Sequence, residues 1–327
     1  MAYNRYSKAN TVDKVDIYTA VTDRFVKGIE DVLEGRATSL PWRCPWQRSG
    51  GLGSLPRNGA TGRAYSGVNV FVLWSTGRSD ARWYTFKQVA ERGDGSHVRR
   101  GEKSEKVVFF SRGQREEADG TKKSWFTLKH FSVFNFDQIE WAAGSKEAKE
   151  VEARLAKLKS AQETTDTSSE VMLLRDKLQA LLGDKLSHGG ERACYRPAED
   201  RVSMPHEEAF KDSAHYVATL AHEVAHWSGH KSRLDRNLSG RFGSSTYAAE
   251  ELVAELASAL VLAQAGIANP DLDANHHAYL AQWAQLLRND KNAIFTAAKL
   301  AREAAEHILP SEVEESSESD EEALAAA

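Results

Sequence analysis

The chain has 327 residues, which is long enough for two domains with hydrophobic cores of their own. The content of 41% hydrophobic and 28% charged residues is typical of a soluble globular protein, and since there is no run of eighteen apolar positions, no transmembrane helix is expected. The net charge of −4 conceals an uneven distribution: residues 1–140 contain 23 Lys and Arg against 16 Asp and Glu, and residues 141–327 contain 20 against 31.

Tryptophan is distributed as unevenly as charge, with six of the eight residues in the first 141 positions. A basic, aromatic-rich first part and an acidic second part indicate two domains with different tasks. The two cysteines, Cys44 and Cys194, form no CxxC motif, so we expect free thiols in a reducing compartment, the cytoplasm. The first sixteen residues lack the apolar segment of a secretory signal.

The first 141 residues predict an α+β domain that begins with an amphipathic helix. Apolar residues recur every four positions between residues 15 and 34, and Gly35 follows as a helix-ending residue. The next segment, LPWRCPWQ at residues 40–47, contains two prolines, which fix the backbone in a turn or an extended path.

Strands are predicted in the second part of this domain. The apolar run at residues 67–74 fits either a strand or a buried helix, because periodicity alone does not distinguish the two. Residues 106–111 and 124–135 are rich in β-branched and aromatic residues, which predicts two strands. The polar segment between them contains an Asp-Gly pair at 119–120 and predicts a hairpin loop.

Residues 142–190 predict a helical linker. Apolar residues at helical spacing predict two helices, separated by a polar segment in which Thr167 and Glu170 match a capping box. This pattern is typical of a helical hairpin or of a semi-rigid spacer between domains.

The remaining chain predicts a mainly helical domain over residues 191–309. A short β-hairpin is expected at residues 193–205, followed by helices at about 212–228, 246–265, 273–288 and 290–308. The tail, residues 310–327, is acidic and lacks aromatic residues, so we expect it to be disordered.

The segment TLAHEVAHWSGH, residues 219–230, contains an HExxH motif formed by His222, Glu223 and His226. On a helix, two histidines four positions apart lie on one face, about 6 Å apart along the axis, so their imidazoles can converge on one ion. The pattern is typical of Zn²⁺, with another divalent ion such as Mn²⁺ as the alternative. Glu223 can then act as the general base for a metal-activated water. The alternative is a helix with ordinary histidines.

His230 continues the four-residue spacing but is not expected to bind the same ion. On an unbroken helix it lies about 12 Å along the axis from His222, which is too far for a shared ligand position. It also comes too early for the HExxHxxGxxH pattern.

A second predicted helix, YAAEELVAEL, offers Glu250, Glu251 and Glu255 as carboxylate candidates. The pattern from Glu251 to Glu255 resembles thermolysin-like and ImmA/IrrE-type peptidases, in which the first carboxylate binds the metal and the residue four positions later supports a ligand histidine. This resemblance implies Glu251 as the third ligand and Glu255 as the supporting carboxylate. We expect Glu250, which is rotated away from that face, to be solvated.

Aromatic and basic side chains in the first 141 residues suggest contacts with single-stranded DNA. Aromatic rings can stack on unpaired bases, and Arg and Lys can contact phosphates. The alternative is that the aromatic residues fill the core and the basic residues are simply solvated. The candidates are Trp42, Arg43, Trp46, Arg63, Tyr65, Trp74, Arg99, Arg100 and Lys103.

Several further segments carry a resemblance to a known family. They include LPWRCPW, NGATGRAYSGVNVFVLW, WYTFKQVAERG, VRRGEKSEKVVFF and SVFNFDQIE in the first part, and YRPAEDRVSMP, YVATLAHEVAHWSGH, SRLDRNL and YAAEELVAEL in the second. In this order along the chain they resemble the ArdC family of plasmid and phage antirestriction proteins. Residues 142–190 are longer and more helical than this family leads us to expect, and the acidic tail is outside the resemblance.

The resemblance implies a single-stranded DNA-binding domain at residues 1–141 and a zincin-like metallopeptidase domain at residues 191–309. It also implies protection of incoming plasmid or phage DNA from host restriction in the bacterial cytoplasm. No membrane partner is expected.

Two hypotheses about function remain open from the sequence. In the first, DNA binding brings a zinc peptidase to proteins on the DNA, such as restriction subunits, in a manner similar to SprT-type proteases. In the second, the protein coats entering single strands and the metal site is only structural. Glu223 favours the first hypothesis, because a purely structural zinc site needs no general base.

Overall fold

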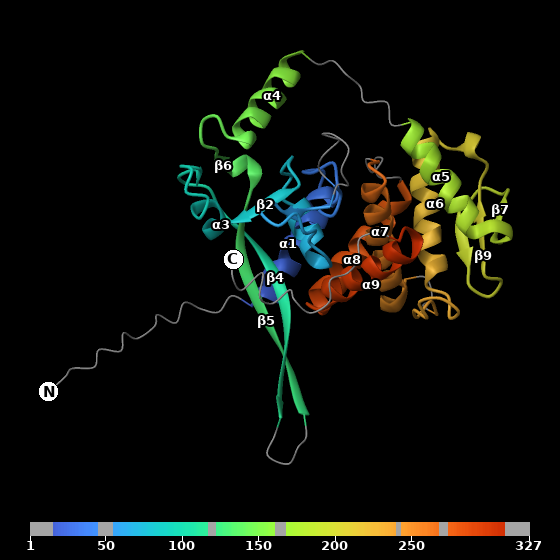
Figure 1. The fold of residues 1–327 in the computed structure, drawn as a ribbon. Helices are drawn as coiled ribbons and strands as arrows, with labels where there is room; N and C mark the ends of the chain where they lie inside the picture. The colour runs from blue at the N-terminus through green and yellow to red at the C-terminus, as the bar shows by residue number, and fades with distance from the viewer. Residues whose placement is uncertain are drawn as a thin grey trace.

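The computed structural model of the chain describes residues 16–44, 55–116, 122–160, 168–239, 243–267 and 274–310. They form a mixed fold of helices and strands, in which an N-terminal half (residues 16–160) lies beside a C-terminal half (residues 168–310) (Figure 1). Trp46, Thr167 and the acidic tail from residue 311 onwards lie outside the described residues, so the predictions made for them are not addressed by the structure.

The N-terminal half begins with the predicted amphipathic helix. Its first N–H groups are capped by Asp16, whose carboxylate accepts a hydrogen bond from the Tyr18 N–H at 3.2 Å. Gly35, at a φ of +70°, follows the helix in a backbone conformation that favours glycine. This half contains α1 (Ile17–Leu33), β1 (Arg57–Asn58), α2 (Val68–Trp74), β2 (Arg82–Thr85), α3 (Phe86–Ala90), β3 (His97–Val98), β4 (Glu105–Glu116), β5 (Lys122–Asn135), η1 (Phe136–Gln138), β6 (Ile139–Glu140) and α4 (Lys146–Ser160).

A four-stranded sheet of order β1-β2-β5-β4 organises this half, and β3 pairs with β6 in a separate ribbon. The two predicted strands form the antiparallel hairpin β4–β5, which is longer than expected and projects away from the body (Figure 1). The ambiguous apolar run is the short helix α2. Because six of its seven residues are buried, its sequence has no polar face from which a helical period could have been detected.

The C-terminal half is mainly helical, as predicted, and its four predicted helices are present. It contains α5 (Ser168–Leu182), η2 (Gly183–Lys185), β7 (Leu186–His188), β8 (Cys194–Arg196), β9 (Arg201–Met204), η3 (Glu207–Ala209), α6 (Ser213–Ser228), α7 (Ser245–Gln264), α8 (Ala274–Asn289) and α9 (Ala293–Ile308). The predicted hairpin is β8–β9, extended by β7 to a sheet of order β7-β9-β8. None of the helices in the described segments is long and apolar enough to cross a membrane.

Helix α7 is the centre of this half. It packs against α6, α8 and α9, and all but a few of its residues between Ala248 and Ala263 are buried. The carboxylates on this helix are therefore placed in the interior of the half, where they need charged or hydrogen-bonding partners.

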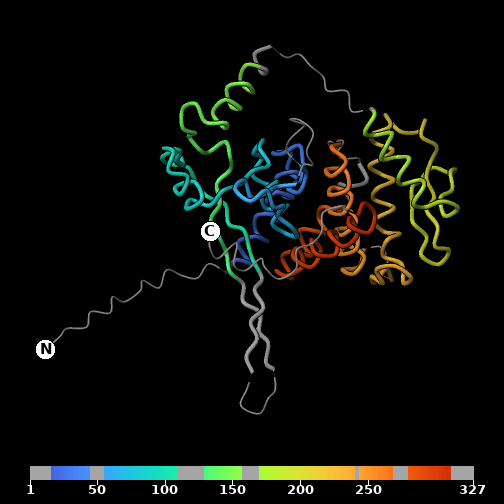
Figure 2. The backbone as a smooth tube through the Cα atoms, in the orientation of Figure 1, coloured from blue at the N-terminus to red at the C-terminus, as the bar shows by residue number. Residues whose placement is uncertain are grey.

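The two helices predicted between residues 142 and 190 are present, but they do not form a hairpin with each other. Helix α4 packs on the N-terminal half, where Glu147 and Glu150 pair with Arg92 and Arg82. Helix α5 packs on α6. Figures 1 and 2 show the two helices on opposite sides of the molecule. Each helix is therefore part of a packed half rather than part of a separate spacer.

The two halves share a hydrophobic core. Helix α1 packs against α8, and the ring of Trp42 lies between Phe25 of α1 and Trp283 of α8, with ring centroids 6.3 and 5.6 Å away. At the edge of this contact, Arg288 of α8 pairs with Glu30 of α1. The relative positions of the halves are thus fixed by buried aromatic contacts.

A pair of leucine substitutions on α5 tests whether this helix belongs to the core. Leu178 is fully buried, so Leu178→Ala should lower the free energy of unfolding by about 2–5 kcal/mol. Leu173, on the same helix, is 58% exposed, and Leu173→Ala should change the free energy of unfolding by no more than about 0.5 kcal/mol. Urea denaturation followed by circular dichroism measures both values; equal effects would contradict the packing of α5.

Candidate metal centre and nucleic-acid interface

Helices α6 and α7 bring three potential metal ligands together. His222 and His226 lie on one face of α6, with their Nε2 atoms 3.2 Å apart. Glu251 of α7 faces both: its Oε2 lies 3.4 Å from Nε2 of His222, and its Oε1 lies 3.6 Å from Nε2 of His226. One donor atom from each residue lies within 4.8 Å of the others, so the three can bind one ion.

The outer nitrogens of the two imidazoles face two further carboxylates of α7. Nδ1 of His226 lies 3.2 Å from Oε1 of Glu250, and Nδ1 of His222 lies 3.9 Å from Oε2 of Glu255. The hydrogen bond to Glu250 fixes the orientation of the His226 ring and leaves its Nε2 directed at the shared centre, whereas Glu255 faces His222 at an ion-pair distance. Glu255 therefore lies beside His222, and its supporting role for this histidine stays a prediction.

The expectation that Glu250 is solvated is wrong. Its side chain is only 11% exposed, and besides His226 it contacts the guanidinium of Arg236. Glu250 is turned about 100° from Glu251 around the helix, but the neighbouring helix α6 covers that direction as well. Glu250 therefore occupies the same supporting position for His226 that Glu255 occupies for His222.

Arg236, which the sequence analysis did not single out, holds Glu250 in place. Its Nη2 lies 2.7 Å from Oε1 of Glu250 and its Nε lies 3.1 Å from Oε2, a two-point contact. Arg236 also donates to the carbonyl of Ala225. A Cβ at Gly229 would lie 2.8 Å from Nη2 of Arg236, so the glycine that ends α6 makes room for this guanidinium. The SRLDRNL segment was the only sequence feature that pointed to it.

The charge balance of the cluster favours a bound cation. The carboxylates of Glu223, Glu250, Glu251 and Glu255 are all buried or nearly so, and Arg236 contacts one of them, Glu250. Burial lowers the pKa of His226, but its contacts with Glu250 and Glu251 raise it to about 10, because a proton there supplies missing positive charge. A divalent ion can take the place of that proton, and the imidazole and carboxylate donors fit Zn²⁺ or Mn²⁺.

Two tyrosines complete the surroundings of Glu251. The hydroxyl of Tyr247 lies 3.2 Å from that of Tyr279 and is hydrogen-bonded to Glu251. Burial raises the pKa of the Tyr279 phenol, and the charges of Glu251 and Glu223 contribute to this, so Tyr279 lies within electrostatic reach of both. Tyr247 precedes Glu251 by one helical turn. This spacing in the sequence indicates that the two side chains lie on the same face of α7, so their contact could have been predicted.

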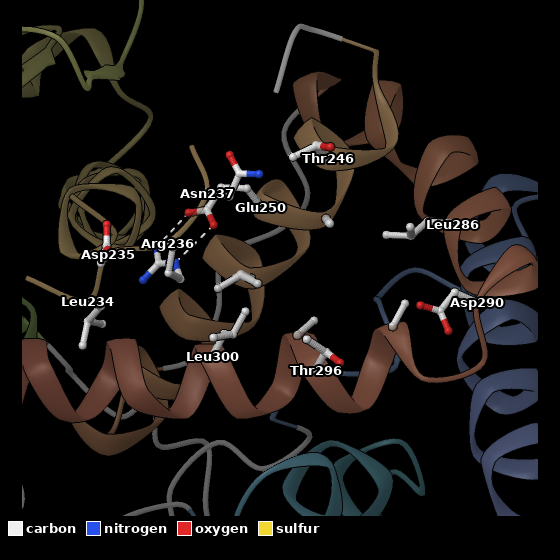
Figure 3. A pocket seen from close by; sticks show the side chains of 14 residues that line it. Leu234, Asp235, Arg236, Asn237, Thr246, Glu250, Leu286, Asp290, Thr296 and Leu300 are labelled. Atoms are coloured by element: carbon white, nitrogen blue, oxygen red, sulfur yellow. Dashed lines mark hydrogen bonds and ion pairs between the residues drawn. The ribbon is translucent and has the colours of Figure 1, made fainter. Parts of the chain in front are cut away.

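A pocket of about 420 Å³ adjoins the centre on the side of Glu250 (Figure 3). Glu250 and Arg236 form part of its wall, and Leu286 of α8, Asp290 directly after α8 and Leu300 of α9 lie across from them. His222, His226 and Glu251 do not line it, so the pocket is separate from the ligand cluster.

His230 lies outside the cluster, as expected. Its Nδ1 lies 2.8 Å from the hydroxyl of Ser232, in the turn after α6. Neither Cys44 nor Cys194 forms a disulfide.

Two of the predicted base-stacking residues are core residues. Trp42 and Trp74 are almost completely buried, so neither ring has a face available to a base, and the prediction that they bind DNA is corrected. They are buried because Trp42 fills the contact between the halves and Trp74 packs on Phe71. Tyr65 is partly buried, and burial raises the pKa of its phenol.

The predicted basic residues are closer to the surface. Arg63, Arg100 and Lys103 are exposed, and Arg43 is partly buried. Arg99 is exposed but donates to the backbone carbonyl of Asp137. Arg100 and Lys103 lie exposed in the turn that leads into β4, where a polyanion can reach them.

Comparison with protein families gives matches in both halves. Residues 15–134 match the N-terminal domain of the anti-restriction factor ArdC, and residues 175–300 match a zincin-like metallopeptidase. The uncharacterized protein y4eC of Sinorhizobium fredii is 34% identical over 306 residues, which cover 89% of this chain and 91% of that protein. A DNA primase TraC of Escherichia coli is 35% identical over 84% of this chain, but this chain spans only 19% of that protein.

Two solved structures are similar over most of the chain. The metal-free structure of the antirestriction ArdC protein from plasmid R388 has a TM-score of 0.68 and 36% identity, covering 90% of this chain and 96% of that one. The Mn(II)-bound structure of the same protein has a TM-score of 0.66 and 35% identity, covering 90% of this chain and 97% of that one.

Substitutions in the cluster should separate metal ligands from neighbouring residues. The purified chain should carry about one divalent ion, and His222→Ala or His226→Ala should abolish binding, because each removes a donor. Glu251→Ala should weaken it. Glu250→Gln should reduce metal affinity by about 10–100-fold through its effect on His226.

Elemental analysis by plasma mass spectrometry, with chelator competition for the affinities, measures these effects. His230→Ala is the matched control and should retain the ion. Loss of the ion in His230→Ala, together with retention in His222→Ala, would contradict this ligand set.

Proposed function

This chain belongs to the ArdC family of antirestriction proteins and contains a zincin-like metallopeptidase domain, and we propose that it binds single-stranded DNA and cleaves proteins associated with that DNA. By this activity it protects incoming plasmid or phage DNA from host restriction in the bacterial cytoplasm. The observation that supports a hydrolytic role is the ligand cluster of His222, His226 and Glu251, with Glu223 next to it in the HExxH motif.

The chemistry follows from the positions of these residues. A bound Zn²⁺ or Mn²⁺ would lower the pKa of a water molecule towards about 7 and polarise a peptide carbonyl. Glu223, buried on α6 beside His222, would serve as the general base for that water and would pass the proton to the leaving amine. Glu250 and Glu255 keep the imidazoles oriented, and Tyr247 restrains the carboxylate of Glu251.

Binding of single-stranded DNA is assigned to exposed cations of the N-terminal half. Arg63, Arg100 and Lys103 are exposed and can contact phosphates without reading sequence. Since the halves share a core, a protein bound to the same strand is held near the metal centre at a raised local concentration. The substrates that we propose are therefore DNA-associated proteins, restriction subunits among them.

A charge-removal pair tests the proposed DNA surface. Arg100→Ala with Lys103→Ala should weaken binding of a fluorescent oligonucleotide and reduce the slope of log affinity against log salt by about 1 to 1.5, because two phosphate contacts are lost. The control pair, Arg192→Ala with Lys211→Ala, removes one exposed Arg and one exposed Lys from the C-terminal half and should leave both quantities unchanged. Equal losses in the two pairs would contradict a specific surface.

Glu223→Gln tests the enzymatic proposal. The variant should retain the metal ion and the affinity for single-stranded DNA, because Glu223 is neither a ligand in the cluster nor part of the proposed DNA surface. Cleavage of a protein bound to single-stranded DNA should fall by about 10²–10⁴-fold, because the general base is lost. Protection should disappear with it in a conjugation assay with a restricting recipient.

The same assay distinguishes the non-enzymatic alternative. If Glu223→Gln protects fully while His222→Ala does not, the metal centre is a structural support and protection depends on binding alone. Retention of proteolysis in Glu223→Gln would contradict the assignment of the base.

A further inference from the structure

Trp42, the first tryptophan of the LPWRCPW segment, lies against the metal cluster. Trp42 is fully buried, and its indole N–H donates to Oε1 of Glu255 at 3.4 Å. The other oxygen of Glu255, Oε2, lies 3.9 Å from Nδ1 of His222. A residue 213 positions before Glu255 in the sequence, from the other half of the molecule, is thus one carboxylate away from a metal-binding histidine.

The N-terminal half holds this tryptophan firmly. Leu40 is buried next to it, and Phe25 of α1 packs on its ring. A Cβ at Gly28 would lie 2.7 Å from Cγ of Pro41, so the helix and the proline-containing turn are in direct contact. The position of the indole is therefore set by α1 and the turn, both of which belong to the N-terminal half.

Glu255 uses its two oxygens for two different partners. With Oε1 fixed by the indole, rotation of the carboxylate about its last bond is restricted, so Oε2 stays directed at His222. Without the indole, the buried carboxylate would have one partner fewer and could turn away from the imidazole.

A second line of contacts reaches Glu251. Trp42 packs edge-on against Trp283, and Trp283 stacks on Tyr279 with ring centroids 6.1 Å apart. The Tyr279 hydroxyl contacts Tyr247, which is hydrogen-bonded to Glu251. Both the supporting carboxylate and the ligand carboxylate of α7 are thus connected to the same ring.

We propose that Trp42 is a positioning residue of the metal centre, through which the N-terminal half raises the metal affinity of the C-terminal half. It acts by orienting Glu255 and, through Glu255, His222. The inference rests on the metal site of the proposed function, but it concerns affinity and geometry rather than proteolysis.

The test compares two tryptophans that are both fully buried in the N-terminal half. Trp42→Phe keeps an aromatic ring in the core but removes the N–H donor, so metal affinity of the full chain should fall about fivefold, equivalent to about 1 kcal/mol. The indole nitrogen of Trp83 donates no hydrogen bond to any described residue, so Trp83→Phe is the matched control and should leave metal affinity unchanged. Chelator competition with Zn²⁺ measures both.

A double-mutant cycle identifies the route of the effect. Glu255→Ala alone should reduce metal affinity by about 10–100-fold, and Trp42→Phe should add nothing in that background, because its partner is absent. The visible absorption bands of the Co²⁺-loaded chain should shift in Trp42→Phe and not in Trp83→Phe, since these bands report ligand geometry.

Unchanged affinity in Trp42→Phe, an equal loss in Trp83→Phe, or an undiminished effect of Trp42→Phe in the Glu255→Ala background would each overturn the inference. A wild-type chain without measurable Zn²⁺ affinity would instead contradict the metal site of the proposed function, on which the inference rests. The two failures are therefore distinguishable in one experiment.

Discussion

Three glutamates of α7 surround two histidines of α6, and the surrounding structure accommodates the resulting excess of buried negative charge. Glu251 faces both Nε2 atoms, while Glu250 and Glu255 face the outer nitrogens. Buried carboxylates are costly unless they are paired or bind a cation. Arg236 satisfies one of them, and the centre between the imidazoles and Glu251 is the position that a divalent ion would fill.

This requirement accounts for residues that are far apart in the sequence. Gly229 leaves room for Arg236, and Trp42 reaches across from the N-terminal half to Glu255. Because these partners hold the imidazoles in place before an ion arrives, the free-energy cost of ordering the site arises on folding rather than on metal binding. If Trp42 couples the halves as proposed, a ligand that displaces the turn carrying Trp42 would change metal affinity, and by linkage metal binding would change the affinity for that ligand by the same factor.

The sequence predicted those parts of the site that depend on spacing within one helix. The HExxH motif placed His222 and His226 on one face of α6, and the resemblance to known peptidases pointed to Glu251 and Glu255 on α7. Periodicity likewise identified α1 and the helices after residue 210, because each has a distinct buried face or lies among clear helix formers.

Contacts between distant segments were beyond the reach of such patterns. The sequence alone places Glu250 in solvent, because a helical wheel does not show which second helix packs against it. It offers Trp42 and Trp74 to DNA, because composition does not distinguish a buried aromatic ring from an exposed one. The helices α4 and α5 are close in sequence, yet α4 pairs with Arg82 and Arg92 of the N-terminal half and α5 packs on α6 of the C-terminal half.

Anomalous X-ray diffraction from crystals of the full chain loaded with Zn²⁺ tests the central claim most directly. The account predicts one strong peak per chain, about 2.0–2.2 Å from Nε2 of His222, Nε2 of His226 and an oxygen of Glu251. Glu250 and Glu255 should remain on the outer nitrogens and not touch the ion. A peak bound by Glu250, Glu255 or His230, or no peak between α6 and α7, would contradict the account.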